Sequence, residues 1–396
     1  MKNKCVIMFG LQSWDIEIGS NFKNIARIIS SHNRVLYVNR PLDSIRRVRH
    51  FKNKEVLQRL ESIKGNSDAI KEVEKNIWVL NPRVILLSIN NLPSGKVYNF
   101  LNKNNNRKLA KEILHFSEQL TFKDPLLIID NDFFNGLYLK EYLKPALFIY
   151  YLRDFLLSQK YFKRHGKRAE PLIIKKADAV CTNSLYLKNY AEKYNSESFY
   201  VGQGCEVDDF TKQGQPLPND MISISCPVLG YCGMLTSKRL DIGLVEYIAI
   251  NNPNWNLVLV GPSDKEFSES KLPELKNVFL LGSKHPWELP AYVRHFDVCI
   301  NPQLINQMTI GNYPRKIDEY LAAGKPVVAT NTETMKYFEH VVYLCDNKEQ
   351  YVSQIQKAFE EKDDIIKKEE RIAFAKSHTW EASVGNIYSV INNISR

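Results

Sequence analysis

A basic and an acidic side chain stand three positions apart in segment 312–330, which reads NYPRKIDEYLAAGKPVVAT. Lys316 and Glu319 are predicted to share one face of a helix near its N-terminal end, where free backbone N–H groups can bind an anion. Lys316 would add a cation for phosphate, and the Glu319 carboxylate offers two acceptors for vicinal hydroxyl groups. One helix could therefore hold the phosphates and the ribose of a nucleotide. The alternative is an amphipathic helix with an ion pair on its surface.

The same segment contains signals that would position this helix. Pro314 suits the first helical position, because its missing N–H costs nothing there. Ile317, Tyr320 and Leu321 recur at helical spacing and should face a core. Gly324 is a natural residue just past the end of a helix. The apolar residues that follow Gly324 predict a buried strand.

Carboxylates at the ends of predicted strands form a second set of candidates. Asp154 comes after the strand 147–151, and Asp132 comes after the strand 126–130. The carboxyl ends of parallel strands form the edge of the sheet at which ligands bind. A carboxylate at that edge could serve as a general base. The alternative for Asp154 is a loop or helix cap, or neutralisation by Arg153.

Short apolar runs alternate with helical periodicity along the chain, which is typical of α/β proteins with parallel sheets. Helices are predicted at 21–30, 108–119 and 185–194, and the charged stretch 43–75 is interpreted as an insertion or a mobile helix. Strands are predicted at 5–9, 34–38, 77–80, 126–130, 147–151, 179–182, 199–201, 227–231, 257–261, 278–281, 298–301, 327–330 and 341–344.

A chain of 396 residues is long enough for two domains of ordinary size. A polar stretch over 208–220, rich in glycine and proline, indicates a linker. The predicted domains are 1–208 and 209–378. The amphipathic segment 379–396 is predicted to form a terminal helix.

The formal net charge of +10 favours anionic partners. Two basic clusters contain apolar or aromatic residues and suggest docking on an anionic membrane surface. The alternative is a solvated face, and nucleic acid is not expected because no nucleic-acid-binding motif accompanies either cluster. The first cluster comprises Arg46, Arg47, Arg49, Lys52 and Lys54, and the second comprises Lys160, Lys163, Arg164, Lys167 and Arg168.

The sequence gives no sign of a signal peptide or a membrane span, since no apolar run approaches about 18 residues. The seven cysteines include no C-x-x-C pair or metal-ligand spacing. Both observations suggest a reducing, cytoplasmic location, with peripheral attachment to the inner face of the membrane as a possible addition.

Segment 312–330 resembles the C-terminal donor motif of GT-B glycosyltransferases, Pro-x-Lys-x-x-Glu-Tyr-x-Ala-x-Gly-x-Pro-Val-Val. Residues 229–241 are similar to the strand, glycine loop and helix that open the donor domain in that superfamily. The resemblance implies an α/β GT-B fold, with two Rossmann-like domains whose parallel sheets face a central cleft. It also implies that Lys316 and Glu319 bind the donor. Retaining members often carry a Glu-x7-Glu pair, but Gly311 stands at the first of these positions.

The same resemblance suggests further donor-binding residues. Gly233 would let the backbone approach a phosphate closely. Lys238 and Arg239 stand where these enzymes often place cations that bind the diphosphate, although a solvated charge pair after a turn is the alternative. Ser283 and Lys284 would lie beside the nucleobase.

The stretches 149–154 and 170–184 resemble the acceptor domain of bacterial polysaccharide glycosyltransferases. Asp154 resembles the general base of inverting bacterial glucuronosyltransferases of this fold, so the resemblance implies a catalytic role and inversion of the anomeric centre. Asp15 and Glu17 are rival bases, because they lie in the loop where other inverting members carry theirs.

The resemblance implies a glycosyltransferase that moves a hexosyl or uronosyl group from a nucleoside diphosphate sugar to a glycan or lipid-linked acceptor. Surface polysaccharide biosynthesis is the expected context, such as capsule or lipopolysaccharide, with UDP as the expected nucleotide and GDP left open. No bound metal and no cofactor besides the donor substrate are implied. The alternatives are a sugar-nucleotide epimerase of the same fold and a non-catalytic glycan- or membrane-binding protein.

Overall fold

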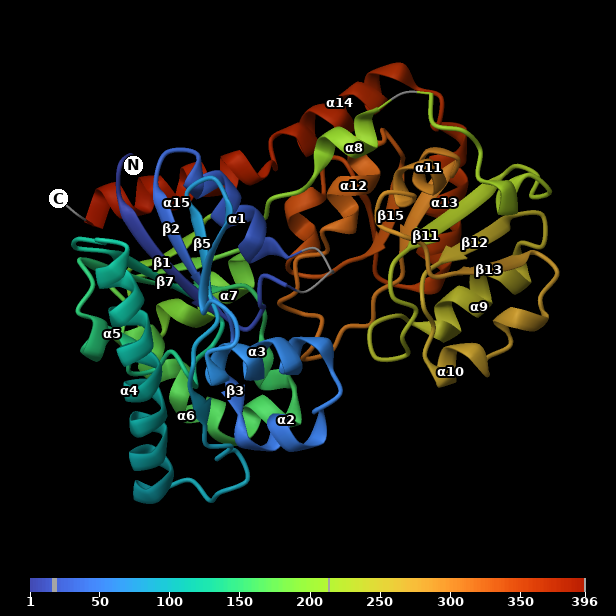
Figure 1. Ribbon diagram of the computed structural model, residues 1–396. Coiled ribbons are helices and arrows are strands. Elements are labelled where there is room, and N and C mark those ends of the chain that lie inside the picture. The colour runs from blue at the N-terminus through green and yellow to red at the C-terminus, as the bar shows by residue number, and fades with distance from the viewer. Residues whose placement is uncertain (16–19, 213, 395–396) are drawn as a thin grey trace. The chain divides into compact units, whose positions relative to one another are not determined.

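The computed structural model describes residues 1–15, 20–212 and 214–394, which form two compact units (Figure 1). Unit 1 consists of Met1–Gly202 together with the chain from Ser383 onward, and unit 2 consists of Gln203–Ala382. The short helix α8 (Val207–Thr211) already belongs to the core of unit 2, because its Val207 and Phe210 are buried there.

Unit 1 is built on a sheet of eight strands: β1 (Cys5–Gly10), β2 (Arg34–Val38), β4 (Ile70–Glu74), β5 (Ile77–Leu80), β7 (Leu126–Asp130), β8 (Leu147–Leu152), β9 (Ala179–Thr182) and β10 (Ser198–Tyr200). Their order is β10-β9-β8-β7-β1-β2-β5-β4, and only β4 runs antiparallel to its neighbour. The chain adds strands first on one side of β1 and then, from β7 on, on the other. Ligands bind outside the carboxyl ends of the strands at such a switch point.

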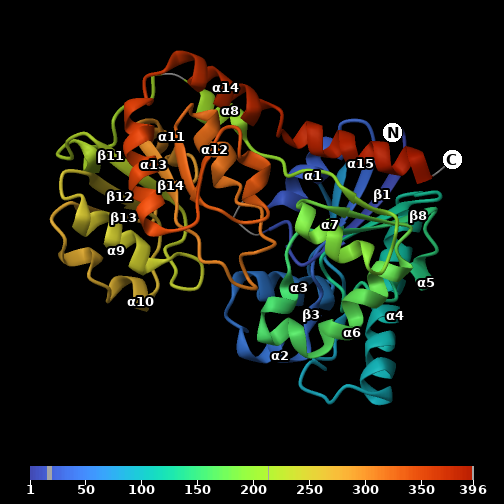
Figure 2. The ribbon, with the colours of Figure 1, turned by 180° about the vertical axis from the view of Figure 1, so that it is seen from behind.

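The helices of unit 1 are α1 (Asn21–Ser30), α2 (Ser44–Arg49), α3 (Lys54–Lys64), α4 (Lys96–Gln119), α5 (Leu139–Leu143), α6 (Lys160–Lys176), α7 (Leu185–Glu192) and most of α15 (Trp380–Ile394). A 3-10 turn spans Leu156–Ser158, and β3 (Leu42–Asp43) pairs with β6 (Ile85–Leu86). Helix α15 runs beside elements of this unit (Figures 1 and 2), where Asn33 Nδ2 donates to the Tyr388 hydroxyl over 3.2 Å.

The charged stretch 43–75, which the sequence analysis interprets as an insertion or a mobile helix, forms the helices α2 and α3 and the edge strand β4. Helix α3 is anchored by Arg59, whose buried guanidinium makes two 2.9 Å hydrogen bonds to the Asp15 carboxylate. Asp15 stands 44 residues before Arg59 in the sequence, so the helical periodicity around Arg59 does not reveal this ion pair.

Helix α4 begins at Lys96 rather than at the predicted Lys108. Its first half buries asparagine side chains, which hide the apolar periodicity of the helix. Asn105 holds the backbone of Leu87 through hydrogen bonds of 3.0 and 2.9 Å, and the Asn106 amide donates to the Phe134 carbonyl over 3.0 Å. Loop backbone therefore satisfies polar groups that the sequence suggests should face water.

Unit 2 contains six parallel strands: β11 (Val228–Cys232), β12 (Asn256–Val260), β13 (Val278–Gly282), β14 (Val298–Asn301), β15 (Val327–Thr330) and β16 (Tyr343–Cys345). Their order, β13-β12-β11-β14-β15-β16, is the strand order 3-2-1-4-5-6 of dinucleotide-binding sheets. The remaining helices of the unit are α9 (Ile242–Asn251), α10 (Lys265–Ser268), α11 (Leu289–Arg294), α12 (Lys316–Ala322), α13 (Lys348–Glu360) and α14 (Ile365–Lys376). Three 3-10 turns span Asn219–Met221, Leu272–Glu274 and Met335–Phe338.

The helix predicted in segment 312–330 is present, but its start was predicted wrongly. Helix α12 begins at Lys316, two residues after Pro314, and Arg315 is the residue that caps it. Its predicted end is confirmed. Gly324 has φ of +75°, and the N–H groups of Gly324 and Lys325 donate to carbonyls of the last helical turn.

Within the part of the chain that the structure describes, no helix is both long and apolar enough to cross a membrane.

Candidate functional site

Glycine residues stand at the carboxyl ends of three neighbouring strands in unit 2. Gly233 follows β11, Gly261 follows β12 and Gly282 ends β13, with φ values of +142°, +143° and +69°. The Gly261 N–H donates to the Gly282 carbonyl over 2.9 Å, and a Cβ atom on Gly261 would lie 1.9 Å from the Gly233 carbonyl oxygen. No side chain fits at Gly261, so the edge presents bare backbone that a ligand can approach closely.

Helix α12 brings Lys316 to this edge. Its Nζ donates to the Tyr231 hydroxyl and lies 3.9 Å from the centroid of the Tyr231 ring. A Cβ atom on Gly233 would lie 2.5 Å from the same nitrogen. The structure therefore brings two of the predicted donor residues, Gly233 and Lys316, together after β11, where the strand order reverses. The sequence did not single out Tyr231 as a partner of Lys316.

Glu319 pairs with Arg315 rather than with Lys316. Arg315 Nε donates to Glu319 Oε1 over 3.0 Å, and the Glu319 side chain is 15% exposed. Burial would lower the pKa of Arg315, but the neighbouring acidic groups, Glu319 foremost, together raise it. The second carboxylate oxygen of Glu319 makes no hydrogen bond with the described residues and keeps its acceptor capacity. It could accept bonds from ribose hydroxyl groups.

Helix α12 is also fixed by buried polar contacts. The Cys232 N–H donates to the Tyr320 hydroxyl over 2.7 Å, and Asp318 Oδ1 lies 3.0 Å from His378 Nδ1. Burial raises the pKa of Asp318, although the contact with His378 acts in the other direction. These contacts hold the face that carries Lys316 and Glu319 in a defined position. Sequence reasoning missed them, because polar residues in a short helix usually face solvent.

Of the other predicted donor residues, Lys238, Arg239 and Ser283 are exposed and Lys284 is half-buried. No side-chain hydrogen bond or ion pair engages Lys238, Arg239 or Ser283 within the described residues. Lys284, by contrast, forms an ion pair, in which its Nζ lies 2.6 Å from Asp220 Oδ2. We therefore interpret Lys284 as structural and leave the roles of the other three as predictions.

In unit 1, Asp154 lies just after β8 at the carboxyl edge of the sheet. Arg153 bridges two carboxylates there, with Nη1 2.8 Å from Asp154 Oδ2 and Nε 2.7 Å from Asp130 Oδ1. Asp130 is fully buried, and this burial raises its pKa although Arg153 acts in the other direction. The Asp154 side chain is 38% exposed, so it is the carboxylate of this pair that a substrate can reach.

The rival bases are engaged in structural contacts. Asp132 is buried, and its carboxylate accepts hydrogen bonds from the backbone N–H groups of Phe134 and Asn135 at 3.0 and 2.8 Å. Asp15 makes the paired contact with Arg59 described above. Glu17 lies outside the described residues. Among the described candidates, Asp154 has the most exposed carboxylate.

No group of three or more histidine, cysteine, aspartate or glutamate side chains within residues 1–15, 20–212 and 214–394 is arranged to hold a metal ion. The expected independence from metal stays a prediction.

Comparisons with known proteins show similarity to glycosyltransferases. Residues 226–361, which contain the glycine edge and α12, match the family described as "Glycosyl transferases group 1". The chain is 30% identical over 239 residues to the "Putative teichuronic acid biosynthesis glycosyltransferase TuaH" of Bacillus subtilis (strain 168). That match covers 58% of this chain and 60% of TuaH, so the chain spans about three fifths of the length of this curated relative.

Solved structures with the same fold cover nearly the whole chain. HepE of Anabaena in complex with UDP matches with a TM-score of 0.67 at 14% identity, over 98% of this chain and 100% of HepE. The alpha,alpha-trehalose 6-phosphate synthase of Burkholderia multivorans matches with a TM-score of 0.67 at 12% identity, over 100% of this chain and 99% of the synthase. At these identities the likeness shows the fold alone. The chain has the GT-B fold of glycosyltransferases, and the predicted resemblance to group 1 of these enzymes is confirmed.

Proposed function

We propose that this protein is a glycosyltransferase that moves a sugar from a nucleoside diphosphate sugar to a glycan or lipid-linked acceptor in surface polysaccharide biosynthesis. The observation that carries the proposal is the position of Lys316 Nζ beside Gly233, 2.5 Å from where a Cβ atom would lie, within the family-matched region. The name of TuaH supports a polysaccharide product, and the UDP in HepE favours UDP as the nucleotide.

In the proposed reaction each unit supplies a different part of the chemistry. In unit 2, Lys316 would offset the charge of the diphosphate as it leaves, and Glu319 would hold the ribose. In unit 1, Asp154 would take the proton of the acceptor hydroxyl as its oxygen attacks the anomeric carbon. The bond between that carbon and the diphosphate breaks, and the nucleoside diphosphate departs with the bonding electrons.

The function is tested by adding UDP, GDP and their sugar conjugates to the full chain and following thermal unfolding. A nucleotide at 100 times its dissociation constant should stabilise the folded state by about 2.7 kcal/mol. With the correct donor and acceptor, the protein should then release nucleoside diphosphate and form a glycosidic product.

Each alternative function gives a different result in the same assays. An epimerase would interconvert donor sugars without an acceptor, and a non-catalytic binding protein would release no nucleoside diphosphate. Absence of any thermal shift with every nucleotide would contradict the proposal.

Two surfaces of unit 1 support membrane attachment as part of this function. Helix α2 combines the basic Arg47 and Arg49 with Val48, which is 71% exposed, and Phe51 beyond its end is 56% exposed. The start of α6 combines exposed lysines and arginines with the exposed Tyr161. Basic residues attract an anionic leaflet, and exposed apolar side chains can enter it.

Replacing Arg46, Arg47 and Arg49 together with serine should reduce co-sedimentation with anionic vesicles at least about tenfold. Each basic residue near a charged leaflet contributes on the order of 1 kcal/mol. Raised salt should weaken the binding of the unaltered protein in the same assay.

The matched control replaces three exposed lysines of unit 2, Lys265, Lys271 and Lys276, with serine, and should retain vesicle binding. If the unaltered protein ignores anionic vesicles even at low salt, the basic clusters are solvated faces.

A further inference from the structure

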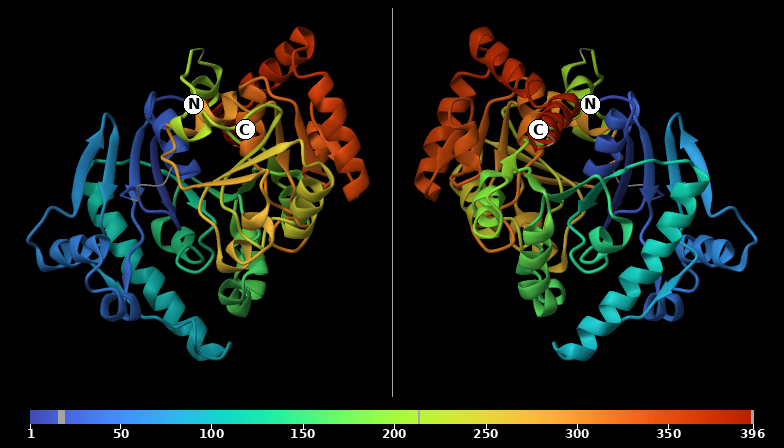
Figure 3. Two further views of the ribbon diagram at one scale, coloured as in Figure 1. Left: turned by 90° about the vertical axis from the view of Figure 1, so that its right-hand side faces the viewer. Right: turned by 90° about the vertical axis from the view of Figure 1, so that its left-hand side faces the viewer.

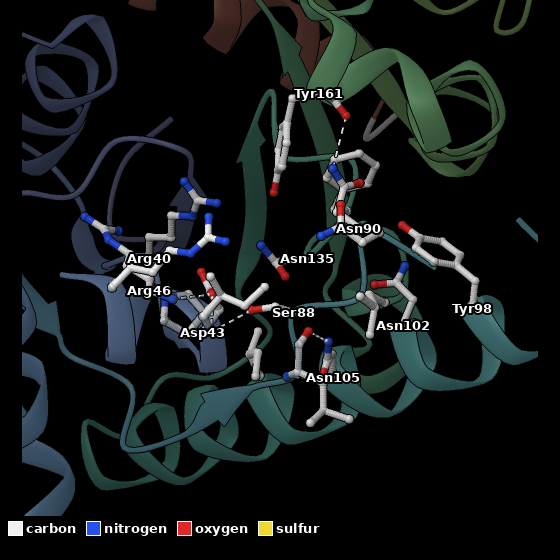
Figure 4. A pocket seen from close by; sticks show the side chains of 18 of the residues that line it. Arg40, Asp43, Arg46, Ser88, Asn90, Tyr98, Asn102, Asn105, Asn135 and Tyr161 are labelled. Carbon is white, nitrogen blue, oxygen red and sulfur yellow. Dashed lines mark hydrogen bonds between the residues drawn. The ribbon is translucent and has the colours of Figure 1, made fainter. Parts of the chain in front are cut away.

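A cavity of about 450 Å³ lies in unit 1, and none of the predicted donor residues lines it (Figure 4). Three of its lining residues come from segments that follow strands of the eight-stranded sheet: Arg40 follows β2, Asn135 follows β7 and Tyr161 follows β8. Ser88 follows β6 of the separate two-stranded sheet. Helix α2 and the beginnings of α4 and α6 gather at the same end of the unit (Figures 1 and 3). The cavity therefore occupies the carboxyl side of the sheet, where parallel sheets bind ligands.

One wall of the cavity is basic. Arg40, Arg46 and Arg49 line it, and among the described lining residues Asp43 is the one carboxylate. That carboxylate is already occupied, because Asp43 Oδ1 accepts hydrogen bonds from the N–H groups of Ile45 and Arg46 at the start of α2. With three guanidinium groups and one carboxylate, which caps α2, this wall of the cavity carries a net positive charge. Arginine suits this task, because its planar guanidinium pairs with the oxygens of phosphates and carboxylates.

Arg46 is partly committed to another partner, since its Nη2 lies 2.6 Å from Glu55 Oε2. Arg40 faces Tyr161, and its charge opposes the burial that raises the pKa of the Tyr161 hydroxyl. Arg49 makes no hydrogen bond or ion pair with the described residues. Arg40 and Arg49 are therefore the cations with capacity for a ligand.

The facing wall offers a fixed, unused acceptor. Asn90 Nδ2 donates to the Tyr161 carbonyl over 3.2 Å (Figure 4). The backbone carbonyl of Asn90 lies 3.0 Å from His165 Nε2. His165 is itself buried and stacks on Tyr98 with ring centroids 3.8 Å apart. Asn90 Oδ1 is buried and has no hydrogen-bond partner among the described residues. Buried polar atoms are rarely left without a partner, and this one requires a donor such as a hydroxyl group.

We infer that this cavity binds a saccharide that carries an anionic group. A neutral sugar would leave the arginine wall without a partner, and an anion alone would leave Asn90 Oδ1 unpaired. A hydroxylated ring with an acidic substituent matches both walls, and about 450 Å³ is within the range of small-ligand sites. As an acidic acceptor this saccharide deepens the proposed function and rests on it, but its binding can be measured without any transfer.

The test compares four probes on the full chain by isothermal titration calorimetry: glucuronate, glucose 6-phosphate, glucose and inorganic phosphate. At least one acidic sugar should bind about tenfold more tightly than glucose and than inorganic phosphate. Whichever acidic sugar binds more tightly identifies the anionic group as carboxylate or phosphate. Equal binding of glucose and both acidic sugars would overturn the inference, and so would inorganic phosphate that binds as tightly as the sugar phosphate.

Two variants on one helix sharpen the result. Arg49→Gln should weaken binding of the acidic sugar about tenfold. Arg47→Gln removes an equally exposed charge from the same helix but not from the cavity lining, and should leave binding unchanged. Equal effects of the two variants would overturn the inference. Arg40→Gln provides a second removal from the cavity wall, and thermal unfolding of each variant verifies the fold.

The thermal shift with UDP, recorded on the same samples, separates this inference from the proposed function. Stabilisation by UDP without binding of an acidic sugar overturns the cavity assignment and leaves the transferase proposal standing. Binding of an acidic sugar without a response to any nucleotide overturns the transferase proposal and supports the cavity assignment.

Discussion

Replacing Asp154 with asparagine is expected to slow glycosyl transfer by about 10²–10⁴-fold while UDP affinity stays nearly constant. The amide keeps the shape of the side chain but cannot take a proton from the acceptor. The fold should survive, because Arg153 retains its 2.7 Å contact with the buried Asp130. The measurement is the steady-state rate of nucleoside diphosphate release with saturating donor, beside UDP affinity from thermal shift.

Asp132→Asn is the matched control, because it alters a rival base on the neighbouring strand. The asparagine keeps one acceptor oxygen for the N–H groups that Asp132 caps, so transfer should stay near normal. NMR of the product should show the anomeric configuration opposite to that of the donor. A near-normal rate for Asp154→Asn, or retention of configuration, would remove Asp154 from the catalytic role.

Lys316→Ala and Glu319→Ala should each weaken UDP binding by about ten- to a hundredfold, since a hydrogen bond to a charged group is worth roughly 1.5–3 kcal/mol. Lys316 lies beside the bare backbone of Gly233, and Glu319 keeps an acceptor oxygen that Arg315 does not use. Isothermal titration with UDP measures the loss. Glu319→Gln retains one acceptor oxygen for Arg315, so its affinity for UDP should lie between the affinities of the parent protein and Glu319→Ala.

Lys271→Ala, which removes an exposed lysine from the same unit, should leave UDP affinity unchanged. Unfolding temperatures of all variants without ligand should lie close together, because the buried face of α12 is not altered. If neither Lys316→Ala nor Glu319→Ala changes the affinity for UDP or GDP, α12 is only an amphipathic helix with charged surface residues.

The strands of both sheets were predicted well because parallel strands are buried on both faces. Such strands appear in sequence as uninterrupted apolar runs, which need no knowledge of the neighbouring strand. Six strands have the predicted bounds: Arg34–Val38, Ile77–Leu80, Leu126–Asp130, Ala179–Thr182, Val298–Asn301 and Val327–Thr330. The end of α12 was equally predictable, because Gly324 sets it through its own backbone conformation.

Helix starts were harder to predict where tertiary contacts replace local signals. Pro314 is a good first helical residue, yet α12 begins at Lys316. The buried amides of Asn105 and Asn106 make the first half of α4 look like a polar loop, although loop backbone satisfies them. A residue's partner across the fold cannot be read from the spacing of its neighbours in the chain.

By itself the sequence determined the class of fold, the position of the donor motif and the residue types available for its chemistry. Those features depend on apolar runs, turn residues and side-chain spacing within a few positions of one another. The tertiary structure decided how the charges pair. It placed Lys316 on Tyr231, 85 residues away, and brought Asp130 to the Arg153 guanidinium that Asp154 also contacts. Strand order sets these pairings, because it brings the carboxyl ends of distant segments to one edge of a sheet.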